Sequence, residues 1–191
     1  MTTKILDNTV ISASISEIVC IDFIDRCSKI YEIETTYEVC QETKYGYDIN
    51  TTNQRYRRIR VIDLRSNGVY KIILKYLENR YPYLHKGELS TFLLSLLHFE
   101  FTHKNYIFVT DDQKMRKLIP QLKQDTMFQS KLSQTYLSQT YTGLRFTGTI
   151  GLIKRLKERN AISVKEIEEI IKDLNNSTFY ITQKVIDYLR S

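Results

Sequence analysis

The sequence predicts an α/β fold, a three-layer α/β/α sandwich with a central, mostly parallel sheet of four or five strands. Short runs rich in β-branched and aromatic residues recur along the chain, most clearly at 106–110 (YIFVT). Segments with the apolar spacing of helices separate these runs. Because parallel strands are usually connected through helices, this alternation favours a sheet that is covered on both faces.

Four strands are expected where short apolar runs meet turn residues, at 4–6 (KIL), 31–35 (YEIET), 58–64 (RIRVIDL) and 106–110. A fifth and last strand would lie within 144–149 (LRFTGT). Helices are expected between and after these runs, at 10–30, 36–44, 68–81, 86–100, 113–124 (disturbed at Pro120), 148–160, 163–177 and 182–191. Ser163 and Glu166 have the spacing of a capping box, which marks the start of one of them.

Residues 1–191 are expected to form one soluble domain that is long enough to bury a core. Within it, 120–145 is an extended insertion or flap that contains LSQTY twice, and 148–191 forms the C-terminal helices. No apolar run approaches the roughly 20 residues of a membrane span, and Asp7 interrupts the apolar start, which argues against a signal peptide. The three cysteines lack metal-ligand spacing, so reduced thiols and a cytoplasmic location are expected.

Acidic residues follow the expected strands. Asp7 comes directly after the first strand, and Asp111 and Asp112 follow 106–110. In an open parallel sheet, functional sites form beyond the carboxyl ends of the strands, at a switch point in the strand order. Glu42 and Glu88 lie on helices that can project to the same edge.

Carboxylates that share a site cannot all stay ionised without compensation, which a divalent cation with oxygen ligands such as Mg²⁺ provides. Each acid also has a structural alternative as a helix cap, a turn residue or a solvated side chain.

Five segments of the chain resemble PIN-domain nucleases. They are KILDNTVIS, TTYEVCQE, LHKGELSTFLLSLL, FVTDDQKMRKL and the C-terminal stretch that begins FTGTIGLIKRLKERN. The resemblance covers nearly the whole chain in the right order, and its last two segments are the most specific. Where members of that family often repeat an acid two residues after the glutamate of the Gly-Glu helix, this chain has Ser90.

The resemblance implies a Mg²⁺- or Mn²⁺-dependent endoribonuclease, often the toxin of a toxin–antitoxin pair. Its partners would be RNA, an antitoxin or other regulatory protein and, as is common in the family, a second copy of the chain. The implied catalytic acids are Asp7, Glu42, Glu88, Asp111 and Asp112, with Asp7, Glu88 and Asp112 as metal ligands. Which of the two adjacent aspartates faces the metal stays open. Thr9 matches a hydroxyl position beside the first acid and is expected to orient it.

Basic residues are expected to bind the substrate around this negative pocket. The segment 54–60 (QRYRRIR) supplies Arg55, Arg57 and Arg58, whose alternative role is to keep a strand edge from aggregating. Arg116 and Lys117 lie one turn beyond Asp112, where they could meet a phosphate or pair with nearby acids. The net charge of +6 also favours a polyanionic partner.

Three other functions remain open from the sequence. The first is the same nuclease chemistry on DNA, in defence or repair, because nothing in the sequence senses a 2′-hydroxyl. The second is a catalytically silent module that binds nucleic acid or protein. The third, a receiver-like phospho-acceptor domain, requires a lysine at the end of the last strand, and LRFTGT lacks one.

Overall fold

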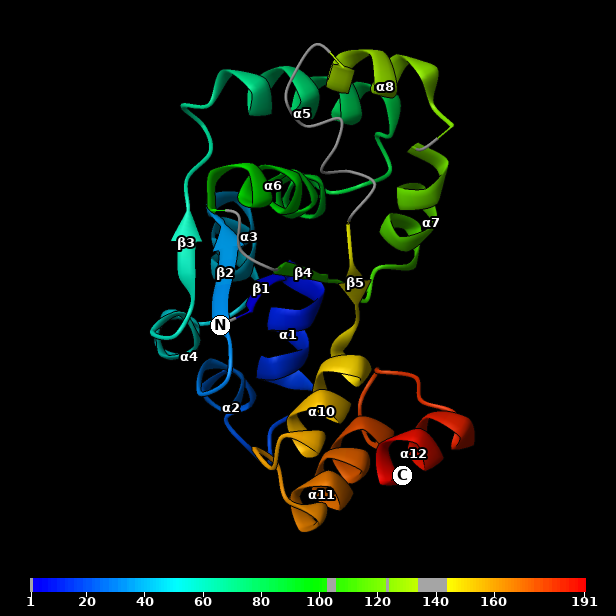
Figure 1. Cartoon of the computed structure of the whole chain (residues 1–191). Helices are drawn as coiled ribbons and strands as arrows, with labels where there is room; N and C mark the ends of the chain where they lie inside the picture. Colours follow the sequence, from blue (N-terminus) through cyan, green and yellow to red (C-terminus); the bar gives the residue numbers. More distant parts are fainter. Residues whose placement is uncertain (1, 103–105, 123, 134–143) are drawn as a thin grey trace.

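The computed structural model describes residues 2–102, 106–122, 124–133 and 144–191. Its five strands form one parallel sheet in the order β3-β2-β1-β4-β5, with helices on both faces, which confirms the expected fold class (Figure 1). The strands are β1 (Thr3–Leu6), β2 (Glu32–Thr36), β3 (Arg60–Ile62), β4 (Tyr106–Val109) and β5 (Phe146–Thr147).

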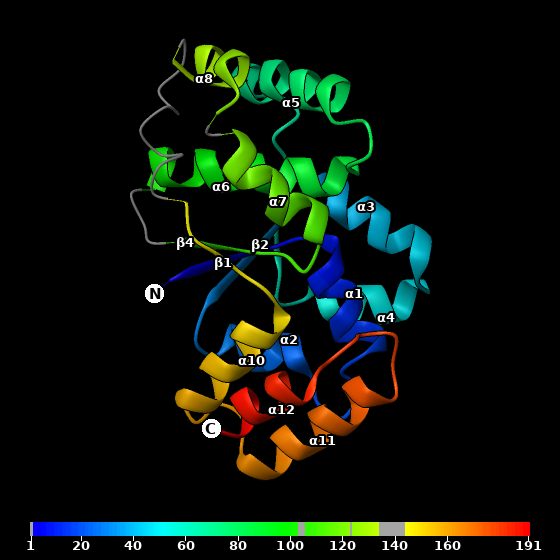
Figure 2. The ribbon, with the colours of Figure 1, turned by 90° about the vertical axis from the view of Figure 1, so that its right-hand side faces the viewer.

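The helices divide between the two faces of the sheet, as Figure 2 shows. On one face lie α5 (Gly68–Arg80), α6 (Lys86–Thr102), α7 (Gln113–Leu122) and α8 (Thr126–Ser133). On the other lie α1 (Asn8–Ser16), α2 (Phe23–Ser28), α10 (Thr149–Glu158), α11 (Val164–Asn175) and α12 (Gln183–Arg190). At the edge near β2 and β3 lie α3 (Tyr37–Gly46) and α4 (Ile49–Tyr56).

The strands contribute to two cores because successive side chains point to opposite faces of a sheet. Ile5 and Phe108 pack against α5 to α8, whereas Leu6, Ile107 and Val109 pack against α1, α2 and the C-terminal helices. Strands that are buried on both faces read as continuous apolar runs, and YIFVT is such a run.

Several element boundaries differ from the sequence-based expectations. The expected helix at 10–30 is two helices, α1 and α2, and 49–56 is a helix that the sequence reading missed. Pro120 lies inside α7, in its last turn, so the helix ends two residues later. The capping box of Ser163 and Glu166 at the start of α11 is confirmed.

The doubled LSQTY lies almost wholly outside the described residues, whereas more than half of the insertion expected at 120–145 is described. The described part of the insertion includes α8. In the part of the chain that the structure covers, no helix combines the length and the apolar character of a membrane span.

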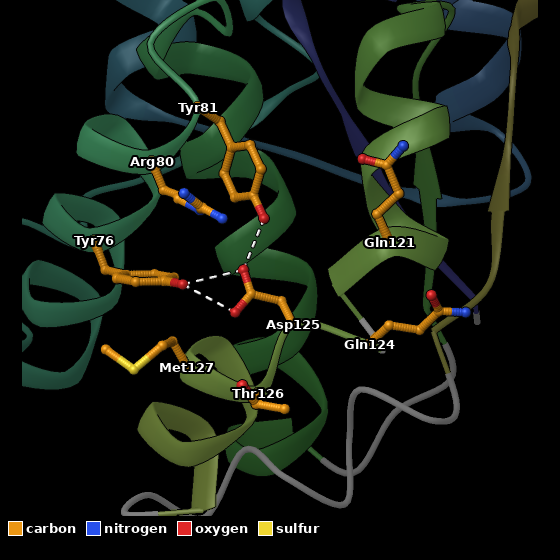
Figure 3. Close-up of a pocket in the computed structure, with 8 residues that line it drawn as sticks. All are labelled: Tyr76, Arg80, Tyr81, Gln121, Gln124, Asp125, Thr126 and Met127. Carbon is orange, nitrogen blue, oxygen red and sulfur yellow. Dashed lines mark hydrogen bonds between the residues drawn. The ribbon is translucent and has the colours of Figure 1, made fainter.

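Asp125 fastens α8 to α5 (Figure 3). Its carboxylate accepts hydrogen bonds from the hydroxyls of Tyr76 (3.0 Å) and Tyr81 (2.8 Å), and from the backbone N–H of Phe128 (2.9 Å). The aspartate is thus both the cap of α8 and the acceptor of two partly buried hydroxyls, whose partners are lost if it is removed.

Replacing Asp125 with Ala is expected to lower the free energy of unfolding by about 2 kcal/mol, because a cap and two side-chain hydrogen bonds disappear together. Urea denaturation measures this change. The matched control is Tyr83→Phe, which alters an exposed tyrosine just after α5 and should change the free energy of unfolding by less than about 0.5 kcal/mol. Equal stabilities for the Asp125 variant and the parent would contradict the role given to Asp125.

Candidate active site

The switch point of the sheet lies between β1 and β4. After β1, the strands β2 and β3 are added in turn on one side of β1, and β4 and β5 follow on the opposite side of β1. Leu6 is in register with Val109, and the N–H of Asp7 donates to the carbonyl of Val109 at 3.1 Å. Asp7 and the segment that follows β4 therefore lie side by side at the carboxyl edge, where open α/β sheets form their sites.

Asp7 is fully buried at the start of α1. Its Oδ1 accepts hydrogen bonds from the N–H groups of Thr9 (3.0 Å) and Val10 (3.3 Å), so it caps the helix. Its Oδ2 is buried and has no hydrogen-bond partner. Burial raises the pKa of Asp7 to about 7, because the charged form loses its hydration.

Thr9 connects Asp7 to Asp111. Its hydroxyl donates to Asp7 Oδ1 at 2.6 Å and accepts the backbone N–H of Asp111 at 3.0 Å. The Asp111 carboxylate in turn accepts the N–H of Thr149 (3.0 Å) and the Thr149 hydroxyl, and so caps α10. Thr9 therefore orients the first acid, in the position that the sequence predicted for a hydroxyl.

Arg116 lies beside Asp111. Its Nε donates to the carbonyl of Thr110 at 2.9 Å. The backbone of Gly148 passes so close that a Cβ there would lie 2.4 Å from Asp111 Oδ1 and also against the guanidinium of Arg116. The absence of a side chain at Gly148 thus leaves room for the carboxylate of Asp111 and the guanidinium of Arg116 side by side. Lys117, the next residue of α7, is exposed.

Asp112 faces a second set of acids. It caps α7 by accepting the N–H of Met115 at 2.6 Å, and it lies near the buried Glu88 of α6. Burial and the neighbouring charge of Asp112 raise the pKa of Glu88 to about 7, and Glu42 acts in the same direction. The two adjacent aspartates therefore diverge, Asp111 toward α10 and Asp112 toward Glu88.

Glu42 reaches the start of α6. Its Oε1 accepts the N–H of Gly87 at 2.8 Å, and a Cβ at Gly87 would lie 2.4 Å from Oε2. Ser90, three residues later, is buried; its hydroxyl lies 2.5 Å from that of Thr36 and donates to the Gly87 carbonyl at 2.8 Å. Where the family pattern has an acid, this chain thus has a serine that ties α6 to the end of β2.

A divalent ion fits the chemistry of these residues, but they do not surround one. Carboxylate oxygens are the ligands that Mg²⁺ prefers, and one of them, Asp7 Oδ2, has no other partner. Among the described residues, however, no three acidic, histidine or cysteine side chains form a group that could hold a metal ion. The acids of the expected shared site lie along one edge of the sheet in two sets, Asp7 with Asp111 and Asp112 with Glu88 and Glu42.

The basic segment Arg55, Arg57 and Arg58 does not lie around the acids, and its expected place was wrong. These arginines precede β3, so in a parallel sheet they lie at the amino edge, opposite the carboxyl edge. Arg55 Nη1 pairs with Asp22 at 2.9 Å, and Arg58 Nε with Asp25 at 3.3 Å. The positive charges of Arg55 and Arg58 therefore serve these local contacts.

Two residues near the acids were missed. Lys114, in the first turn of α7, is close enough to Glu88 to favour its charged form. Glu38 lies one turn before Glu42 on α3; it is buried, and neither of its carboxylate oxygens has a hydrogen-bond partner. The four-residue spacing of Glu38 and Glu42 places both on one face of the helix, a signal that the sequence did contain.

A groove of about 540 Å³ runs past Asp111 and Asp112. One wall is α1, and the first turns of α7 contribute Lys114 and Lys117. Tyr47, after α3, and Phe179, before α12, add two aromatic rings to its lining. The groove thus combines carboxylates, cations and rings from segments far apart in the sequence.

No protein-family model, curated protein or solved structure matches this chain. Its fold and its carboxyl edge define an α/β protein with an acid-lined crevice at the switch point of the sheet. The resemblance to PIN-domain nucleases stays a prediction, and a function has to be argued from the geometry.

Proposed function

We propose that this protein is a metal-dependent endoribonuclease that hydrolyses RNA phosphodiester bonds at the switch-point crevice. One observation carries the proposal: carboxylates from segments up to about a hundred residues apart gather at the edge where such sheets form their sites. Buried acids in such an arrangement destabilise a fold, so their presence in a crevice indicates a functional role.

The chain's own residues would bind and orient the substrate. A divalent ion would neutralise phosphate charge and lower the pKa of a water molecule. Asp7, Glu88 and Asp112 would have to draw together to hold it, because no three acids of the described chain form a metal group. Without an ion, burial and the charge of Asp112 raise the pKa of Glu88 to about 7, and the positive charge of a bound ion would lower that pKa again. Thr9 and Thr149 hold Asp7 and Asp111 in place before any substrate arrives.

The groove beside the acids is suited to a single strand. Lys114 and Lys117 can contact phosphates, and the rings of Tyr47 and Phe179 offer stacking faces for unpaired bases. None of these contacts reads a base edge, so cleavage is expected to depend on salt more than on sequence.

The test is cleavage of single-stranded RNA and single-stranded DNA, each with Mn²⁺ and with a chelator. We expect Mn²⁺-dependent cleavage of RNA, reduced about tenfold or more by Asp112→Asn, because the amide still caps α7 but carries no charge. The control is Asp63→Asn, which changes an exposed acid that follows β3 and pairs with Arg65. RNA that stays intact, or an Asp112 variant as active as the parent, would refute the proposal, and cleavage of DNA alone would assign the activity to DNA.

A second candidate is a catalytically silent module with the same fold. It is favoured by the observation that each of the five acids accepts a backbone hydrogen bond, while no three in the described chain form a metal group. Titration calorimetry with Mn²⁺ separates the two candidates, because the silent module predicts no binding that depends on Asp7 or Asp112.

A further inference from the structure

Lys4 is a buried cation at the opposite edge of the sheet. It lies in β1, in register with Ile33 and Ile107, and only 1% of its surface is exposed. Its Nζ lies 4.3 Å from the centre of the Tyr31 ring. It forms no ion pair with any acid in the described part of the chain.

Four cations on α10 and just after it divide into two pairs. Lys154 donates to Ser191 Oγ at 3.0 Å and Lys157 to the carbonyl of Leu189 at 2.9 Å, so these two fasten the end of α12. Arg155 and Arg159 are exposed and, like Lys4, have no acidic partner among the described residues. The two lysines thus have an evident structural role, and the two arginines do not.

Arg159 lies beside Lys4, and Arg155 precedes it by one turn on the same face of α10. The guanidinium carbon of Arg159 lies 5.8 Å from the centre of the same Tyr31 ring that Lys4 contacts. Burial lowers the pKa of Lys4 to about 8, and the charges of Arg155 and then Arg159 act in the same direction. Lys4 and Arg159 therefore share one ring, and the charge of Arg155 adds to the repulsion between them.

The surroundings compensate this repulsion only in part. The Tyr31 ring attracts the cations, and the C-terminal end of α10 favours positive charge. The neighbouring acid Glu32 does not help, because strand residues alternate between faces and its Oε2 accepts the Thr3 hydroxyl at 3.2 Å on the other side of the sheet. Among the described residues no acid pairs with these three cations, so an anion that binds there would supply a counter-charge.

We propose that Lys4, Arg155 and Arg159 form a binding site for a phosphate group at the amino edge of the sheet. A guanidinium donates two parallel hydrogen bonds to phosphate oxygens, and an ammonium adds a compact charge, so this set matches a phosphate in charge and in donors. The phosphate comes either from a small phosphate compound or from the backbone of a nucleic acid. The site does not depend on the proposed nuclease activity.

The experiment is titration calorimetry with inorganic pyrophosphate and with a 2′-O-methyl RNA 12-mer, both in a chelator so that nothing is cleaved. The test variant is Arg155→Gln with Arg159→Gln. The control is Lys165→Gln with Lys172→Gln, which removes the same charge from exposed positions on α11. We expect at least tenfold weaker binding for the test variant and less than twofold for the control.

The two ligands distinguish the sources of the phosphate. Weaker binding of pyrophosphate assigns the site to a small phosphate compound, and weaker binding of the RNA alone assigns it to backbone phosphates. If the parent binds neither ligand, or if the test variant binds both as the parent does, the proposal is wrong.

Lys4→Met provides a second readout of opposite sign. If Lys4 has only a structural role, its replacement by Met should lower the melting temperature. If Lys4 is instead part of an anion site, the variant should melt at the same or a higher temperature than the parent in phosphate-free buffer. Pyrophosphate should then raise the melting temperature of the parent but not that of the variant. A lowered melting temperature together with an intact pyrophosphate effect would overturn the assignment of Lys4.

Discussion

Replacing Asp7 with Asn is expected to stabilise the protein at pH 8 while it abolishes divalent-dependent RNA cleavage. The stabilisation follows from burial. Asp7 has an ordinary pKa of 3.8 in the unfolded chain and about 7 in the folded one. Between these values the folded protein holds a proton that the unfolded chain has lost, so stability falls as the pH rises from about 4 to 7.

The size of the effect follows from the same values. The Asp7 carboxylate lowers the free energy of unfolding at pH 8 by up to about 4 kcal/mol relative to pH 4. Asn cannot ionise, but its amide oxygen still accepts the N–H groups of Thr9 and Val10, because Asn and Asp cap helices almost equally well. The free energy of unfolding of the variant should therefore fall much less between pH 4 and pH 8 than that of the parent. Glu88, whose pKa is also raised, accounts for part of the remaining fall.

The loss of cleavage follows from the lost charge. The amide cannot offset the positive charge of a divalent ion, so we expect the cleavage rate to fall about a hundredfold or more. Gel assays with Mn²⁺ measure the rate, and urea denaturation at pH 4.5 and pH 8 in a chelator measures stability.

Asp48→Asn is the matched control for Asp7→Asn. Asp48 caps α4 with two backbone hydrogen bonds of 3.0 Å, as Asp7 caps α1. Unlike Asp7 it is exposed, and its pKa is lowered first by the Thr51 hydroxyl and then by those backbone bonds. Its replacement should leave cleavage unchanged and make the protein slightly less stable at pH 8. If Asp7→Asn behaves in the same way, Asp7 is only a helix cap.

Much of the fold could be predicted because each strand has a local signature. YIFVT is an almost continuous run of apolar residues, and KIL is apolar except for Lys4, since strands buried on both faces need no polar alternation. The boundaries inside 10–30 could not be predicted, because the break between α1 and α2 is made by tertiary contacts: the N–H groups of Val19 and Cys20 donate to Asp173 of α11 at 2.9 and 2.8 Å. Because Asp173 lies more than 150 residues further along the chain, the local sequence of 10–30 does not indicate its effect.

The candidate site was predicted only as far as strand ends allowed. The places of Asp7, Asp111 and Asp112 followed from the rule that parallel strands end at one edge. The divergence of the two aspartates did not, because it depends on Thr149 binding one of them and α7 the other. The arginines before β3 were misplaced although the same rule applies to them, because residues that precede a parallel strand lie at the amino edge.

Replacing Gly87 with Ala is expected to reduce cleavage about a hundredfold without destabilising the fold. A methyl group at this position would lie 2.4 Å from Glu42 Oε2 and 2.7 Å from Glu42 Cδ. The carboxylate is the far end of a flexible side chain, so it can move away at little energetic expense, and Ala in a helix offsets part of the lost hydrogen bond. A catalytic acid displaced by about 1 Å can lower a rate about a hundredfold.

The control is Gly68→Ala at the start of α5, where an added methyl group would meet nothing within 4 Å. Both variants replace a glycine near a helix start, so they share the gain in helix propensity and differ only in the contact with Glu42. Cleavage assays and urea denaturation on the two variants then distinguish an effect of the position of the Glu42 carboxylate from an effect of protein stability. If Gly87→Ala cleaves RNA as fast as Gly68→Ala, the location of the Glu42 carboxylate does not matter for the reaction, and the acids of the carboxyl edge do not act together.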